Sequence, residues 1–346
     1  MELINEGEFE VPIVSEFSSI NEYRVTDYGE LYILVKEFEE TEERRIFKNY
    51  NYKNTHVYLL TGDDYETETI ELEDNKRIEA MTFRVDDKRN FTITGTYGDF
   101  DARGVTGMFY KQLNFDTGDV GVLSYEEFSE DFITQDWSDR SKKKMEKKKK
   151  KGKDVTPILY NYIMRQAELL KDGSIVGSME QYYVRVVTTT DPRTGATRTT
   201  YYYYYKDIIA FKLNKDGEFD WVQKIDKYQV STNDNGYFSS YCRYIDGEKL
   251  CFLFNDNSDN YDEGSDEYSV TDNAPASSRM SKKKNTVALC TIDLESGDVE
   301  RKMFFDREEL GALAVPKLFN VDYLNNEVLL YAVRWKKEQF GVMDIN

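Results

Sequence analysis

The sequence is poor in the residues on which metal centres and nucleophilic enzymes depend. His56 is the only histidine among 346 residues, and the three cysteines have no C-x-x-C spacing. Sites that need two imidazole ligands are therefore excluded, which removes most catalytic zinc centres and the facial-triad iron enzymes. His56 lies in NTHVYLL, where a strand is expected to begin, and no G-x-S-x-G motif accompanies it. We expect no catalytic residues and no cofactor.

Other absences narrow the class of protein. Only 5 Pro and 20 Gly are present, which excludes collagen-like and Pro-rich chains, and no apolar run approaches the ~18 residues of a membrane span. The first residues, MELINEGEFEVPIV, have neither the basic nor the apolar region of a signal peptide. The protein is therefore expected to be cytoplasmic if the chain is complete, or else a mature or trimmed form. A net charge of -19 argues against generic nucleic-acid binding.

The cysteines allow two interpretations. Cys242 and Cys251 flank the turn of an expected hairpin, YIDGEKL, and could form a disulfide in an oxidising compartment. Alternatively all three are buried thiols, because Cys251 lies in LCFLF and Cys290 in VALCTI. The apolar flanking residues favour thiols.

What the sequence does contain is internal repetition. Five strand–turn–strand units recur, and their polar turns are centred on Gly29, Lys88-Arg89, Gly173, Gly247 and Asn325-Asn326. A second hairpin follows in the first four units, and the fifth is cut short at FGVMDIN. Two hairpins make a four-stranded antiparallel unit. The chain is therefore predicted to be all-β, a β-propeller of about five four-stranded blades with one inserted helix, spanning residues 1–346 as a single domain.

The two ends of the chain permit two ring architectures. Residues 2–14 are expected to form an unpaired strand, which could complete the last blade and close a five-bladed ring, giving a monomer. The alternative is a fragment of a larger ring whose upstream blades are missing.

The later units resemble a family of uncharacterised exported proteins, β-propeller-like and typical of Bacteroidota. The resemblance is carried by DFITQDWSDRSKKKMEKKKKKGKDV, by EQYYVRVVTTTD with YYYYYKDI, by FNDN, and by VLLYAVRWKKEQFG. It implies a periplasmic or extracellular location and a longer N-terminus, which favours the larger ring. The family has no established activity, so no catalytic residue can be carried over.

The first of three insertions, residues 124–153, is predicted to be a lysine-rich helix. Ser124 and Glu127 fit a capping box, and Gly152 could end the helix. Its lysines, with Lys147, Lys148, Lys149 and Lys150 as the selected binding residues, are either a solvated helix end or a basic site for anionic partners.

The second insertion, residues 182–207, is predicted to be a long hairpin that turns at DPRTG. Strand alternation would place Tyr201, Tyr203 and Tyr205 on one face and Tyr202 and Tyr204 on the other. These five tyrosines either pack on a neighbouring blade or form a binding surface.

The third insertion, residues 255–285, is predicted to be a polar loop. Asn255, Asn257 and Asp259 have the alternate spacing of a calcium loop, but Asn260 stands where that loop needs Gly and Asp266 where it needs Glu. They are weak metal candidates, and we predict no metal site.

These features favour a non-enzymatic binding or scaffold protein that docks a protein or an envelope polysaccharide. The alternative is a carbohydrate-binding or carbohydrate-active propeller, because two carboxylates can hydrolyse glycosides without histidine or metal. No motif selects such a pair among the 65 Asp and Glu residues.

Overall fold

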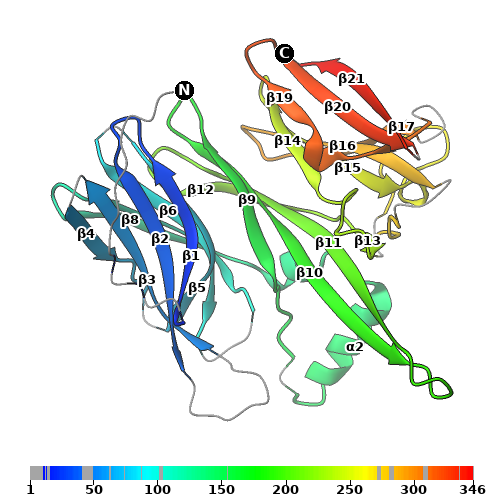
Figure 1. Cartoon of the computed structure of the whole chain (residues 1–346), viewed down its shortest axis with the longest axis horizontal. Coiled ribbons are helices and arrows are strands. Elements are labelled where there is room, and N and C mark those ends of the chain that lie inside the picture. The colour runs from blue at the N-terminus through cyan, green and yellow to red at the C-terminus, as the bar shows by residue number, and fades with distance from the viewer. Residues whose placement is uncertain are drawn as a thin grey trace. The chain divides into compact units, whose positions relative to one another are not determined.

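The structure is a computed structural model that falls into two compact units, Met1–Leu123 and Ser124–Asn346. It describes residues 11, 13, 16–40, 50–61, 64–73, 75–86, 88–100, 104–153, 155–270, 274–279, 284–306, 311–334 and 336–345. The fold is all-β, as predicted, with five antiparallel sheets among these residues (Figure 1).

The first unit contains two four-stranded antiparallel meanders. One is formed by β1 (Ser18–Val25), β2 (Leu31–Glu40), β3 (Tyr50–Thr61) and β4 (Asp64–Thr69). The other is formed by β5 (Lys76–Val85), β6 (Asn90–Asp99), β7 (Gly107–Asn114) and β8 (Val120–Glu127). Each strand pairs with the next in the chain, so the predicted two-hairpin unit is confirmed here.

The second unit contains three sheets and the helices. Its strands are β9 (Tyr162–Leu169), β10 (Ile175–Thr190), β11 (Thr197–Leu213), β12 (Phe219–Ile225) and β13 (Gln229–Thr232); β14 (Tyr241–Asp246), β15 (Lys249–Asn257), β16 (Asn285–Asp293) and β17 (Val299–Asp306); and β18 (Leu313–Ala314), β19 (Asn320–Asp322), β20 (Glu327–Arg334) and β21 (Lys337–Asp344). Its helices are α1 (Glu130–Thr134), α2 (Asp139–Lys149) and two single 3-10 turns, η1 (Ser258–Asn260) and η2 (Pro316–Leu318).

The predicted turns are confirmed by their backbone geometry. A residue with positive φ lies in each of them: Gly29, Arg89, Gly173, Gly247 and Asn326. Tight hairpins need this left-handed conformation, which Gly and Asn adopt at low cost. Local turn chemistry therefore explains why the repeat could be found from the sequence.

The three sheets of the second unit pack face to face in chain order. Phe252 and Phe254 of β15 point to one side and pack with Ile208 and Trp221 of the preceding sheet. The intervening Leu253 points to the other side and packs in a cluster with residues of the following sheet. The middle sheet is thus buried on both faces, which explains its nearly continuous apolar strands.

Three local expectations are wrong. His56 lies well inside β3 and is paired on both sides, since β3 begins at Tyr50 and not near His56. The predicted capping box fails because Ser124 and Glu127 belong to β8, whose pairing with β7 overrides the local helix signal. The insertion holds two helices and not one, because a second N-cap at Ser138 starts α2.

The N-terminal strand expected at residues 2–14 lies almost entirely outside the described residues. Of that segment the structure describes Val11 and Ile13, which pack against a core cluster of β2 and β3 that contains Tyr58.

A substitution at Gly177 in β10 tests how closely β10 packs against the Phe211 side chain of β11. A Cβ at Gly177 would lie 2.1 Å from the ring of buried Phe211, whereas one at Gly341 would meet only Leu330 at an ordinary 3.8 Å. We expect Gly177→Ala to lower the free energy of unfolding by about 1–3 kcal/mol, the usual cost of overpacking, and Gly341→Ala to change it by much less. Denaturant unfolding of both variants measures the difference. Equal effects would show that Phe211 does not lie across Gly177.

Candidate binding surface

The second insertion forms a long hairpin, here called the tyrosine hairpin (residues 182–207), from β10 and β11. β9 pairs with β10 only as far as Gln181, and β12 pairs with β11 only from Ile208 onward. The two strands therefore continue past β9 and β12 as a ribbon, which β13 joins along Tyr202–Tyr205 (Figure 1). The turn forms at the expected DPRTG, where Asp191 accepts hydrogen bonds from Arg193 N–H and Thr194 N–H.

One face of the tyrosine hairpin, the valine face, is apolar and uncharged. Val184 lies opposite Tyr203, and Val186 lies opposite Tyr201. The exposed fractions of Val184, Val186 and Tyr201 are 38%, 55% and 44%. The Tyr203 hydroxyl donates to Asn235 Oδ1 at 2.7 Å. This face presents an exposed apolar strip beside which the Tyr203 hydroxyl keeps a hydrogen-bond partner, a combination found at many binding surfaces.

The opposite face, the arginine face, combines cations with aromatic rings. Exposed Arg185 lies opposite Tyr202, and strand alternation places exposed Arg198 on the same side. Nearer the base, the rings of Tyr183 and Tyr204 stack at 4.7 Å with an interplanar angle of 15°. Burial raises the pKa of Tyr183 to about 12, so its phenol stays neutral. Guanidinium groups beside aromatic rings are suited to anionic or planar groups.

A buried carboxylate fixes the base of the hairpin at the β-bulge between Glu180 and Tyr182. Glu180 is fully buried, and its Oε2 accepts hydrogen bonds from Arg165 Nε at 2.9 Å and Nη2 at 2.6 Å. Ser240 Oγ donates to the same oxygen, and buried Lys227 Nζ donates to Oε1, each at 2.8 Å. A buried charge is tolerated only with such partners, so β9, β10 and the segment after β12 are held together here.

Of the five predicted tyrosines, Tyr205 belongs to this base and not to the surface. Its side chain is buried, and its ring lies 4.7 Å from that of Tyr182, with the Arg165 guanidinium 5.8 Å from its centroid. Gly236 lies so close to this ring that a Cβ there would be 2.4 Å away. The other four tyrosines are at least partly exposed.

The lysine-rich helix α2 is a second charged surface. Ser138 caps its N-terminus, and Gly152, with a φ of 67°, follows its end as predicted. Lys147, Lys148 and Lys150 are exposed and make no ion pair with any other described residue, whereas Lys149 pairs with Glu130 of α1. Figure 1 shows α2 and the hairpin tip toward the same end of the second unit.

A buried lysine anchors the helices to the sheet, and no sequence motif marks it. Lys224 of β12 has a fully buried ammonium that lies 2.6 Å from Asp136 Oδ1, in the connection between α1 and α2, and 3.9 Å from Asp207 Oδ2. Gln135 Nε2 also donates to Asp226 Oδ1 at 2.9 Å. Burial, together with Asp136 and Asp226, raises the pKa of Asp207 to about 7.

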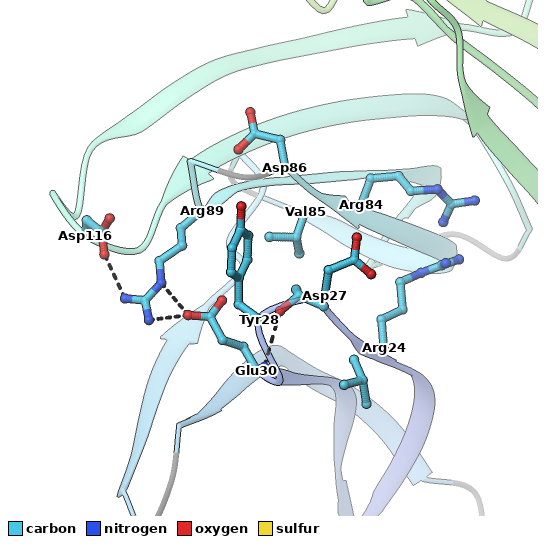
Figure 2. Close-up of a pocket in the computed structure, with 11 residues that line it drawn as sticks. Arg24, Asp27, Tyr28, Glu30, Arg84, Val85, Asp86, Arg89 and Asp116 are labelled. Carbon is cyan, nitrogen blue, oxygen red and sulfur yellow. Dashed lines mark hydrogen bonds and ion pairs between the residues drawn. The ribbon is translucent and has the colours of Figure 1, made fainter. Parts of the chain in front are cut away.

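The first unit contains an open pocket of about 750 Å³ at the turns of its two sheets (Figure 2). Arg89 closes one wall by donating to Glu30 at 2.7 Å and to Asp116 at 2.8 Å, and Tyr28 stands exposed in the middle. Arg24 on the far side pairs with Glu22. Three arginines and four carboxylates line the pocket, so it does not present a large excess of one sign to a ligand.

The three metal candidates make separate interactions. Asn255 is buried and donates to the Ala314 carbonyl at 2.8 Å. Asn257 caps η1 by accepting from Asp259 N–H, and the Asp259 carboxylate pairs with Lys284. Within the described ranges, no group of three or more His, Cys, Asp or Glu side chains gathers as a metal site.

The cysteines are buried free thiols, as their flanking residues favoured. Burial raises the pKa of Cys242 to about 12 and that of Cys251 to about 11, so both stay protonated at neutral pH.

Comparison with known proteins adds no family assignment. No protein-family model matches the sequence, and no curated protein matches it at a significant level. None of the described helices has the length and apolarity needed to cross a membrane.

The buried Asp207 should make stability depend on pH. Its folded pKa of about 7 lies above the ~3.9 of an unfolded aspartate, so the folded state holds the extra proton between these values. Its contribution is therefore fully present below pH ~4 and is lost as pH rises through about 7.

We expect Asp207→Asn, which cannot ionise, to flatten this dependence, so that the Tm difference between pH 5 and pH 8 shrinks by a few degrees. Thermal unfolding of both proteins at the two pH values measures it, with Asp216→Asn, an exposed aspartate, as the control. An unchanged difference would show that Asp207 is not the titrating group.

Proposed function

We propose that this chain is a non-enzymatic binding and scaffold protein that docks an anionic protein or envelope polysaccharide. The observation that carries the proposal is the arginine face, where Arg185 lies exposed opposite Tyr202 and Arg198 lies exposed on the same side, opposite Thr189. The rest of the chain is strongly acidic, with a net charge of -19, so such a basic projection is a local exception. The exposed lysines of α2 add a second attraction for the same anionic partner.

The scaffold part of the proposal is a β-propeller. The five sheets would be its blades, closed into a ring by the chain's own ends or belonging to a larger ring. The face-to-face packing of three successive sheets in the second unit supports this arrangement. The family resemblance adds a periplasmic or extracellular location, where envelope polymers would be the available partners.

A binding assay with polyanions tests the docking function. We expect poly-L-glutamate and alginate, but not neutral dextran, to bind in fluorescence anisotropy, more weakly as salt rises. Arg185→Gln with Arg198→Gln should weaken binding about five- to thirtyfold, because each exposed charged contact contributes on the order of 0.5–1 kcal/mol. Replacing Lys147, Lys148, Lys149 and Lys150 by Ser should weaken it at least as much.

The matched control removes the same charge elsewhere in the second unit. Lys171 and Lys215 are exposed, and changing both to Gln should leave binding nearly unchanged. Equal losses in this control and in the arginine variant would mean that only net charge matters. Absence of binding to both polyanions would contradict the proposal.

A second candidate function, carbohydrate hydrolysis, has one observation in its favour. Asp207 has the raised pKa of a general acid, and Asp136 and Asp226 lie near it as possible second carboxylates. However, the buried Lys224 ammonium lies 2.6 Å from Asp136 and 3.9 Å from Asp207, so these carboxylates already have a partner inside the protein. We expect no turnover of aryl glycosides or polysaccharides by the native chain. Hydrolysis that falls at least 100-fold in Asp207→Asn would establish the enzyme instead.

A further inference from the structure

We propose that the outer edge of β10, from Val184 to Thr190, binds an extended acidic segment of a partner polypeptide as an added antiparallel β-strand. This inference rests on the proposed function, because it names the partner class and the binding mode of the same hairpin. It predicts which backbone groups of the partner are required.

The backbone groups of β10 alternate in direction along this edge. Tyr182 N–H donates to the Asn161 carbonyl at 2.9 Å, away from β11, whereas Asp191 N–H donates across the turn to the Ala196 carbonyl at 2.9 Å. Antiparallel strands alternate between inward and outward groups. The outward N–H and C=O groups therefore belong to Val184, Val186, Thr188 and Thr190.

No described strand uses these outward groups. β9 ends its pairing at Gln181, while the opposite edge of the ribbon is covered by β13 along Tyr202–Tyr205 and by the Asn233 side chain, which accepts from Tyr201 N–H. The open edge reads YVRVVTTT, with no proline and with Arg185 as its one charged side chain. An open edge strand without proline, and with a single charge, is a template for strand addition.

The two faces of the ribbon define the partner. Side chains of an added strand alternate between the valine face, beside Val184 and Val186, and the arginine face, beside Arg185 of β10. The preferred segment therefore alternates apolar and acidic residues. A second copy of the same edge fits poorly because it would bring another Arg185 and no carboxylate. Asp191, the acid nearest to this edge, is already used in the turn.

The test uses a blocked, fluorescent decapeptide of alternating Val and Glu and measures its anisotropy with the full chain. Val186→Pro removes one outward N–H but no hydrogen bond between β10 and β11, so the hairpin should remain folded. We expect Val186→Pro to weaken binding at least tenfold and Val186→Ala, which keeps the N–H, to weaken it less than threefold.

N-methylated peptides test the need for backbone hydrogen bonds on the native chain. This test does not depend on whether the Val186→Pro variant folds. In an antiparallel pair, a partner valine on the valine face directs its N–H toward β10, and the glutamates direct theirs away. Methylating the valine amides should abolish binding, while methylating the glutamate amides should change it less than threefold.

Two results would overturn the inference. Equal binding of both methylated peptides, with polyanion binding intact, would leave the docking function standing as charge attraction alone. Absent peptide binding, combined with dimerisation that Val186→Pro abolishes in light scattering, would assign the edge to a second copy. Loss of polyanion binding as well would end the proposed function itself.

Discussion

The tyrosine hairpin depends on one buried carboxylate. Glu180 lies where β10 leaves its sheet, and its oxygens accept hydrogen bonds from Arg165, Lys227 and Ser240. Removing a charge from water costs several kcal/mol, which only well-placed partners offset. Any displacement of β9, β10 or the segment after β12 would leave that charge unpaired. The hairpin base is therefore the rigid part of this surface, and the Arg165 guanidinium beside the rings of Tyr182 and Tyr205 extends that rigidity outward.

The ribbon beyond this base has fewer stabilising contacts than the base itself. It is held by the pairing of β10 with β11, and β13 covers only part of one edge. An isolated two-stranded ribbon is marginal in water, so exposed β-branched and aromatic residues here are a stability cost that binding could offset. A third strand would satisfy open backbone groups and cover the apolar strip of the valine face. The same features that would make this segment an aggregation risk make it suited to docking an extended partner.

The sequence revealed those features that are encoded locally. Turns such as Gly173 and Gly247, and the long strands around DPRTG, follow from residue preferences within a few positions. The Glu180–Lys227 and Lys224–Asp136 pairs join residues 47 and 88 positions apart, with no motif to mark them. The burial of Tyr205 was equally hidden, because it depends on Gly236. Ser124 and Glu127 show the reverse case, in which strand pairing overrides a local helix signal.

Residue-resolved amide hydrogen exchange along β10 tests most directly whether this edge is open. We predict alternation: the N–H groups of Arg185, Val187 and Thr189 point to β11 and should be protected, whereas those of Val184, Val186 and Thr188 should exchange rapidly. Addition of an alternating Val-Glu peptide should slow exchange of the second set only. Equal protection of both sets in the free chain would mean that the edge is already covered. Rapid exchange of both sets would mean that the ribbon does not persist in solution.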